Sequence, residues 1–199
     1  MGTLRLQTLT FQNRGPYNLV VKPGQCICIT GASGSGKSLL LRSIADLDPH
    51  EGEVYLDDLE LNKCKPTDWR KQVGLLPAES RWWSEFVQDH FDAISDSVLQ
   101  QLGFNRDVLG WEVRRLSTGE RQRLAIARLL ENQPKVLLLD EPTASLDNQN
   151  VVKVEELILN YSTNRQASVV WVSHDQDQVK RVADRHFILS ETKLTEVEK

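Results

Sequence analysis

The sequence has few cysteines, little net charge and no long apolar run, and each of these shortages excludes a class of protein. Three cysteines among 199 residues, at no repeating spacing, are too few for the disulfide framework of a small secreted protein. A net charge of −4 excludes a strongly basic protein that coats nucleic acid. No apolar run reaches the roughly 20 residues that span a bilayer, and no signal peptide opens the chain. We therefore expect a cytosolic protein, which can still bind a membrane protein.

The composition that is present is typical of one globular domain. Hydrophobic residues make up 40% of the chain and charged residues 26%. Short apolar runs that indicate strands alternate with amphipathic segments that indicate helices. The expected strands cover 26–30, 52–56, 135–140 and 168–173, and the expected helices cover 37–47, 118–132, 148–162 and 176–183. Such alternation predicts a mainly parallel sheet with helices on both faces.

A glycine-rich loop lies between an expected strand and an expected helix. It fits the pattern G-x-x-x-x-G-K-[ST] of a phosphate-binding loop (P-loop) and consists of Gly31, Ala32, Ser33, Gly34, Ser35, Gly36, Lys37 and Ser38. Its glycines let several backbone N–H groups face one centre, and the start of a helix adds a partial positive charge. We expect Lys37 to reach the β- and γ-phosphates of a nucleotide and Ser38 to ligate Mg²⁺. A turn that only caps the helix is the alternative.

Two carboxylates follow the apolar strand that ends near residue 139. In open α/β sheets ligands bind beyond the carboxyl ends of the strands. We expect Asp140 to hold Mg²⁺ through water and Glu141 to orient and polarise the attacking water. Acidic residues at strand ends are common, so this interpretation depends on the P-loop.

The segment LSTGE at 116–120 precedes an apolar helix. Ser117 and Glu120 have the spacing of a capping box, which alone would explain both residues. The helix start is also a candidate anion site, because Gly119 allows close approach to the backbone. Since the chain already has one complete P-loop, a second anion site indicates a nucleotide shared between two subunits.

Together these segments resemble the ATP-binding cassette (ABC) ATPases. GASGSGKS at 31–38 is similar to the Walker A motif of that family, LSTGE at 116–120 to its signature motif, and VLLLDE at 136–141 to Walker B. SLD at 145–147 resembles the D-loop, and His174 resembles the switch histidine. The order and spacing of all five match, over essentially the whole chain, and the compact size is similar to small bacterial members.

The resemblance implies a head-to-tail homodimer with two ATP molecules bound between Walker A of one copy and the signature of the other. Ser117 and Gly119 would contact the γ-phosphate held by the other copy. Asp147 would help couple the two sites. His174 would contact the γ-phosphate and help position the water. Glu141, His174 and Lys37 would then be the catalytic residues.

The resemblance also implies a fold. We expect a single domain over 1–199 of the α/β class: a P-loop NTPase core with a mainly parallel sheet, an N-terminal antiparallel β part and a short α-helical subdomain. The core would cover about 1–78 and 116–199, and the subdomain about 79–115. This last segment is polar and aromatic, lacks strand signals and predicts two or three short helices.

The sequence departs from the family pattern at two motifs. Ala78 occupies the position of the glutamine that normally touches the Mg²⁺ sphere, and the next residue, Glu79, is a hypothetical substitute. Thr118 replaces the second glycine of the signature, where small residues are tolerated, so we expect activity to survive.

Two sets of aromatic residues have open interpretations. Phe11 and Tyr17 are candidates for stacking on adenine, or are core residues. Segment 79–115 contains Trp82, Trp83, Phe86 and Phe91, which form the core of the subdomain or expose an indole to a partner. We hypothesise that Trp82 or Trp83 lines a groove that receives a helix of the partner; complete burial of both indoles would contradict this.

The leading hypothesis is a Mg²⁺-dependent ATPase subunit of a membrane transporter. It would energise a separate permease from the cytoplasmic face of the cell membrane and would bind no nucleic acid. The alternative is a soluble ABC ATPase of translation or DNA maintenance, although those relatives usually carry two cassettes or a long coiled-coil insertion. A small-molecule kinase is disfavoured by the signature and the switch histidine. The transported substrate and its direction are not encoded in these motifs.

Overall fold

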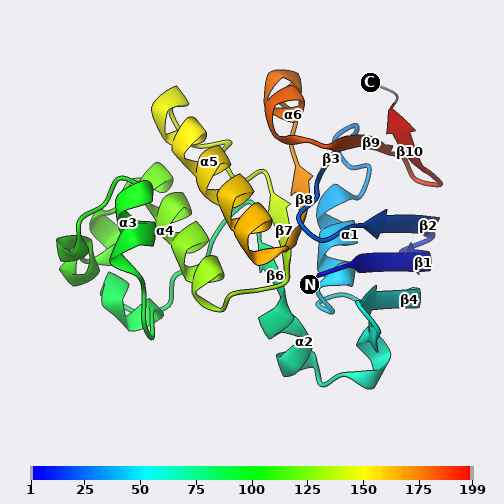
Figure 1. Ribbon diagram of the computed structural model, residues 1–199, viewed down its shortest axis with the longest axis horizontal. Helices are drawn as coiled ribbons and strands as arrows, with labels where there is room; N and C mark the ends of the chain where they lie inside the picture. Colours follow the sequence, from blue (N-terminus) through cyan, green and yellow to red (C-terminus); the bar gives the residue numbers. More distant parts are fainter. Residues whose placement is uncertain (1, 198–199) are drawn as a thin grey trace.

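A computed structural model describes residues 2–197 and contains a six-stranded sheet with helices on both faces (Figure 1). The strand order is β10-β9-β3-β8-β7-β6, in which β10 is antiparallel and the other five are parallel. The strands are β3 (Cys26–Thr30), β6 (Val73–Leu76), β7 (Val136–Asp140), β8 (Ser168–Val172), β9 (Arg185–Leu189) and β10 (Leu194–Val197). The predicted mainly parallel sheet is confirmed.

A second, antiparallel sheet has the order β2-β1-β4-β5 and lies beside the first (Figure 1). Its strands are β1 (Leu4–Phe11), β2 (Arg14–Val21), β4 (Glu51–Leu56) and β5 (Leu59–Glu60). In β2, buried positions alternate with exposed ones from Tyr17 to Val21, the pattern of a strand with one face on the core. This sheet is the antiparallel N-terminal part that the sequence predicts.

Helices cover both faces of the parallel sheet. The α-helices are α1 (Lys37–Ile44), α2 (Pro66–Gln72), α3 (Asp96–Gln101), α4 (Thr118–Glu131), α5 (Asn148–Arg165) and α6 (Gln176–Val182). Leu138 of β7 faces a core that contains α1 and the antiparallel sheet, whereas its neighbour Leu137 faces a core that contains α4, α5 and α6. Helix α1 is therefore buried between the two sheets. This packing fixes the position of its first turn, which follows β3 through the glycine-rich loop.

Helix α1 is shorter than the sequence predicts. The predicted helix runs to residue 47 with Leu47 on its apolar stripe, but α1 ends at Ile44 and Leu47 is 43% exposed. Asp46 adopts a positive φ of 57°, which turns the chain out of the helix. The indole N–H of Trp69 donates to the Ile44 carbonyl at 2.9 Å, and Arg70 donates to the Asp46 carbonyl at 2.8 Å. Side chains of α2 thus satisfy carbonyls that a longer helix would use.

Segment 79–115 contains one α-helix, α3, and three 3₁₀ turns, at Val87–His90, Arg106–Gly110 and Val113–Arg115. Val87, Leu99 and Leu102 from this segment are almost fully buried in the same core as Leu124 of α4. The segment therefore packs against α4, whose first residues are the signature motif. Within residues 2–197, no helix has the length and apolar character needed to cross a membrane.

Candidate functional site

The candidate site lies where three neighbouring parallel strands end. In the sheet β8 lies between β3 and β7, so Thr30, Val172 and Asp140 end their strands at one edge. The P-loop follows β3, His174 follows β8 and Glu141 follows β7. The fold thereby gathers motifs that are more than 100 positions apart in the sequence, at the edge where open α/β sheets bind ligands.

The P-loop depends on two glycines. At Gly31 a Cβ atom would lie 2.5 Å from the carbonyl oxygen of Leu189, so any side chain would collide with β9. Gly36 has a φ of 99° and forms the N-cap of α1. Lys37 is 7% exposed, and its ammonium group donates to the carbonyls of Gly31 at 3.0 Å and Ala32 at 3.1 Å. The lysine therefore lies inside its own loop, where a phosphate would be cradled.

The tip of the loop faces solvent. Ala32, Ser33 and Gly34 are exposed, whereas Ser35 is buried and its N–H donates to the Ala32 carbonyl at 3.1 Å. This exposed turn directly precedes the first turn of α1, whose backbone N–H groups have no partner inside the helix. Such an arrangement suits a ligand with several anionic oxygens.

Asp140 is a buried carboxylate beside Ser38. It is 7% exposed, and burial raises its pKa, as does the charge of Glu141. A hydrogen bond from Ser38 is the strongest influence that lowers the pKa, followed by the charges of Lys37 and His174. Burial thus makes the ionised form of Asp140 unfavourable in free energy, and a cation bound nearby would offset this penalty.

The pair Ser38 and Asp140 fits Mg²⁺. This ion prefers hard oxygen ligands and usually combines one or two protein groups with water and phosphate oxygens. Residues 2–197 contain no cluster of three or more metal-ligating side chains. Here the protein would supply only the Ser38 hydroxyl and the Asp140 carboxylate, and water and nucleotide phosphate oxygens would supply the other ligands. Such a site needs no larger cluster of ligating side chains.

Glu141 and His174 form a pair at the mouth of the site. The His174 Nε2 atom lies 3.0 Å from a Glu141 carboxylate oxygen, and the two side chains are 51% and 35% exposed. Glu141 has a positive φ of 49°, and its N–H donates to the Val172 carbonyl at 3.1 Å. A non-glycine residue in this conformation is held by its surroundings at a cost of about 1–3 kcal/mol. The backbone of Glu141 is therefore fixed against the end of β8, and its carboxylate contacts His174.

The start of α4 is the capping box that the sequence allows. Ser117 Oγ accepts from the Glu120 N–H at 3.2 Å, and the Glu120 carboxylate accepts from the Ser117 N–H at 2.8 Å. A Cβ on Gly119 would lie 3.3 Å from both the Leu146 side chain and the Ser145 carbonyl, so α4 begins against the D-loop. Capping explains Ser117 and Glu120 in the free chain, and the assignment of Ser117 and Gly119 to a γ-phosphate remains a prediction.

Asp147 begins α5. Its carboxylate accepts from the backbone N–H of Asn150 at 2.9 Å and from the side-chain amide of Asn150 at 2.7 Å. The backbone N–H bond from Asn150 is the main reason that the pKa of Asp147 is lowered. The side chain is exposed, as is that of Ser117, so both are open to a second copy of the chain. The role of Asp147 in coupling the two nucleotide sites remains a prediction.

The two candidates for adenine stacking are both core residues in this structure. Phe11 is 4% exposed and Tyr17 1%. The Tyr17 hydroxyl donates to the carbonyls of Ser190 at 2.8 Å and Glu191 at 2.9 Å. Neither ring presents a free face to a base.

Two residues near the site carry no motif and were missed by the sequence analysis. Arg14 donates to the Ser35 carbonyl of the P-loop at 3.3 Å and pairs with Glu191 at 3.2 Å. Gln178 is 2% exposed, and its side chain accepts from the hydroxyl of Ser173, the residue before His174, at 2.9 Å. An isolated arginine in a hairpin gives no sequence signal, and neither does a glutamine in an amphipathic helix.

We predict that Glu79→Ala lowers ATP turnover about tenfold, the effect of losing one contact to a charged group, and raises the Mg²⁺ concentration needed for half-maximal rate. Glu79 is exposed just beyond β6, the strand beside β7, and lines a cavity with Thr118 and Arg121. Phosphate release measured across a Mg²⁺ titration tests this, with the exposed Glu85→Ala as control. Unchanged turnover and unchanged Mg²⁺ dependence would show that Glu79 does not replace the missing glutamine.

The fold defines a P-loop NTPase of the α/β class, with the P-loop, Asp140, Glu141 and His174 at one edge of the parallel sheet. The sequence model of the family described as ABC transporter matches residues 15–144. The chain belongs to the ABC transporter family and is of its ATP-binding subunit type, so the resemblance drawn from five motifs is confirmed.

Relatives and solved structures agree with this assignment. The chain is 33% identical to the phosphate import ATP-binding protein PstB of Aeropyrum pernix, over 88% of this chain and 79% of that protein. It is also 33% identical to the probable iron export ATP-binding protein FetA of Escherichia coli, over 81% and 78%. Among solved structures, a dimeric post-hydrolysis state of the ATP-binding cassette MJ0796 bound to ADP and Pi has a TM-score of 0.84 at 25% identity, over 98% of both chains.

A bacterial Atm1-family ABC exporter with ATP bound shows the same fold. Its TM-score is 0.86 at 22% identity, and the match covers 98% of this chain but only 38% of that one. One chain of that exporter thus contains a unit with the fold of the present chain together with further structure.

Proposed function

We propose that this chain hydrolyses ATP to ADP and phosphate with Mg²⁺, dimerises around two nucleotides, and energises a separate integral-membrane permease from the cytoplasmic face of the cell membrane. The observation that carries this proposal is the convergence, at one sheet edge, of the buried Lys37, the buried Asp140 and the paired Glu141 and His174. The dimeric cassette and the named relatives support it.

Binding would begin at the P-loop. Lys37 leaves the carbonyls of Gly31 and Ala32 for the β- and γ-phosphates, which offer stronger, charge-assisted hydrogen bonds. The N–H groups of the loop and of the first turn of α1 surround the same phosphates. Mg²⁺ held by Ser38 and, through water, by Asp140 would neutralise charge on the phosphate oxygens.

Hydrolysis would depend on Glu141. Its carboxylate is only 35% exposed and can accept a hydrogen bond from a water placed in line with the γ-phosphate. His174 holds one carboxylate oxygen at 3.0 Å and is exposed enough to reach the γ-phosphate from the same side. The two side chains therefore orient each other before the reaction begins.

A second copy would complete the site. Ser117 and Asp147 are exposed, and α4 begins against the D-loop, so one surface carries both motifs. In a head-to-tail dimer this surface would cover the nucleotide of the other copy. Sharing each nucleotide between two chains makes dimerisation depend on ATP.

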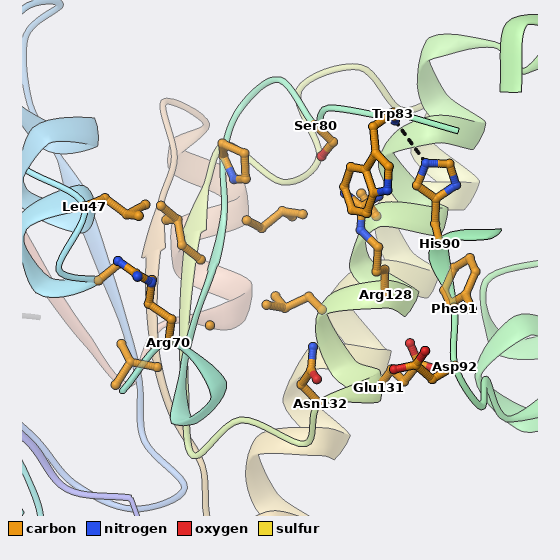
Figure 2. A pocket seen from close by; sticks show the side chains of 18 of the residues that line it. Leu47, Arg70, Ser80, Trp83, His90, Phe91, Asp92, Arg128, Glu131 and Asn132 are labelled. Carbon is orange, nitrogen blue, oxygen red and sulfur yellow. Dashed lines mark hydrogen bonds between the residues drawn. The ribbon is translucent and has the colours of Figure 1, made fainter. Parts of the chain in front are cut away.

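A groove of about 490 Å³ is a suitable site for a helix of the permease (Figure 2). Figure 2 shows Leu47 and Arg70 on one side of it, with Trp83, His90 and Arg128 on the other. Trp83 is 71% exposed, and its backbone N–H donates to His90 Nε2 at 3.0 Å. Its ring packs edge-on against the His90 ring at 4.6 Å between centres, and the Arg128 guanidinium lies 4.8 Å from its ring centre. A rigidly held, exposed indole is the residue type that most often anchors an interface.

The proposed function is tested by fractionating cells that express the tagged chain. We expect the wild type to sediment with membranes, and Trp83→Ala to move to the soluble fraction because losing a central tryptophan weakens an interface by about 30-fold. Trp111→Ala is the matched control, since this exposed tryptophan lies outside the groove. Sedimentation with ribosomes instead would favour a soluble ABC ATPase of translation. In a separate assay, the purified chain should bind ATP and should release phosphate only when Mg²⁺ is present.

A further inference from the structure

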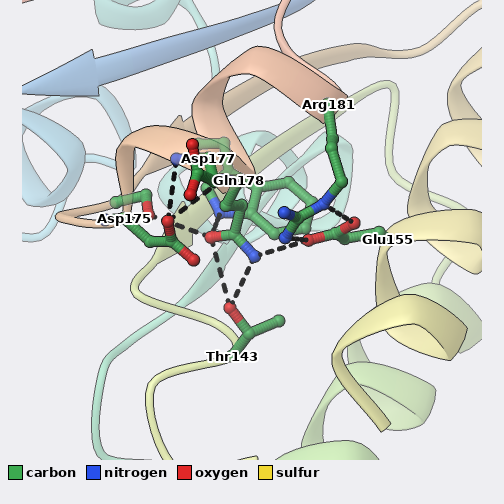
Figure 3. Close-up of polar contacts among 8 residues, drawn as sticks. Thr143, Glu155, Asp175, Asp177, Gln178 and Arg181 are labelled. Atoms are coloured by element: carbon green, nitrogen blue, oxygen red, sulfur yellow. Dashed lines mark hydrogen bonds and ion pairs between the residues drawn. The ribbon is translucent and has the colours of Figure 1, made fainter. Parts of the chain in front are cut away.

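Gln178 lies at the centre of a buried hydrogen-bond network behind the candidate site. It belongs to α6 and is 2% exposed (Figure 3). Its side-chain amide contacts residues from three other segments, which Figure 3 shows converging on it. None of the sequence motifs includes this residue.

All four hydrogen-bonding positions of the Gln178 amide are filled. Its Nε2 donates to Thr143 Oγ1 at 2.8 Å and to a Glu155 carboxylate oxygen at 2.9 Å. Its Oε1 accepts from Ser173 Oγ at 2.9 Å and from the indole N–H of Trp171 at 3.2 Å. An indole can only donate and a carboxylate can only accept, so these partners fix the orientation of the amide.

The partners of Gln178 lie next to the residues of the proposed reaction. Ser173 immediately precedes His174, and Thr143 is two residues after Glu141. Glu155 lies on α5, the helix that Asp147 begins. Gln178 also lines a cavity of about 290 Å³ together with Glu141 and His174. One amide thus connects the segments that carry all three functional side chains.

Two partners of Gln178, Glu155 and Ser173, are themselves held by further hydrogen bonds. Glu155 is 6% exposed and forms two hydrogen bonds with Arg181, at 2.8 and 3.0 Å. Ser173 Oγ also accepts from the Asp175 N–H at 3.1 Å, which fixes the turn after His174. Because each bond is directional, the network sets the positions of these loops more tightly than apolar packing would.

We infer that Gln178 is a positioning residue for ATP hydrolysis: it keeps the loop after β7 and the loop after β8 in the register that holds Glu141 beside His174. The inference rests on the proposed function. Gln178 does not contact the P-loop lysine or Ser38 through any hydrogen bond in the described residues, so its effect should fall on turnover rather than on nucleotide binding.

Three variants of the 199-residue chain test the inference. Gln178→Leu keeps a side chain of similar size but removes every hydrogen bond of the amide, and Gln178→Glu places a second carboxylate against Glu155. We expect kcat to fall about 100-fold in both, the effect of a misplacement of about 1 Å, while the KM for ATP changes less than about twofold. Combining Gln178→Glu with Glu155→Gln restores a hydrogen bond between the two positions but gives up one of the two Arg181 contacts of residue 155, so it should recover part of the lost kcat.

Two control variants separate positioning from loss of stability. Gln176→Leu changes an exposed glutamine on the same helix and should leave kcat unchanged. Val179→Ala lowers stability by removing a buried side chain that is 4% exposed, without touching the network, and should also keep its kcat per folded molecule. The indole N–H resonance of Trp171 should move upfield in Gln178→Leu, because it loses its acceptor.

The outcomes distinguish this inference from the proposed function. A wild-type chain that binds no ATP or releases no phosphate contradicts the proposed function, and the inference with it. An active wild type contradicts the inference alone if its Gln178→Leu form has the same kcat, or if its Val179→Ala form loses as much kcat per folded molecule as Gln178→Leu does. A double variant that folds but recovers none of the kcat lost by Gln178→Glu also overturns it.

Discussion

A Glu141→Gln variant will bind ATP and accumulate as an ATP-bound dimer, while its turnover falls by about 10²–10⁴-fold. Binding and closure need the phosphate contacts of the P-loop, which this change leaves in place. Turnover needs a carboxylate to accept a hydrogen bond from the attacking water, and a neutral amide is a much weaker base. Phosphate release and size-exclusion chromatography with ATP measure the two effects separately.

The matched control for this variant is Glu156→Gln, an identical change at an exposed position on α5. It should turn over ATP at the wild-type rate and show no stabilised dimer. If Glu141→Gln hydrolyses ATP as fast as the wild type, Glu141 is not the group that activates water, and the contact with His174 at 3.0 Å has another purpose.

Replacing Lys37 by alanine will weaken ATP binding by about 10- to 100-fold, the effect of losing a charge-assisted hydrogen bond of about 1.5–3 kcal/mol. The lysine is 7% exposed, and its ammonium group lies inside the P-loop against the carbonyls of Gly31 and Ala32. Titration of ATP by calorimetry measures the loss. ADP should be affected less than ATP, because the lysine also reaches the γ-phosphate.

Lys37→Met separates charge from packing in the same experiment. Methionine keeps most of the apolar stem of the lysine and removes only its charge, so it should bind ATP as weakly as the alanine variant. Lys180→Ala, at an exposed lysine on α6, is the control that should bind normally. Normal ATP binding by Lys37→Met would mean that the ammonium group makes no phosphate contact.

The sequence predicted what depends on local pattern. Apolar runs identified strands β3, β7 and β8, and motif spacing identified the residues that follow each of them, because strand ends in a parallel sheet meet at one edge. The capping box at Ser117 was also visible, since a cap is formed by residues close in sequence.

The sequence did not predict what depends on distant contacts. Helix α1 stops at Ile44 because Trp69, from another helix, takes its last carbonyl. Tyr17 is buried because its hydroxyl finds carbonyls more than 170 residues away. The partners of Gln178 come from segments between 5 and 35 residues away, so periodicity shows only that the residue is on a helix.

The Ser117 hydroxyl in the free chain already donates to the carboxylate of Glu120 at 2.8 Å. A phosphate oxygen presented by the other copy would therefore replace an existing acceptor rather than satisfy an idle donor. Replacing one acceptor by another yields little net free energy. If the proposed dimer forms, this contact would add little to its stability, so the two copies could separate readily after each turnover.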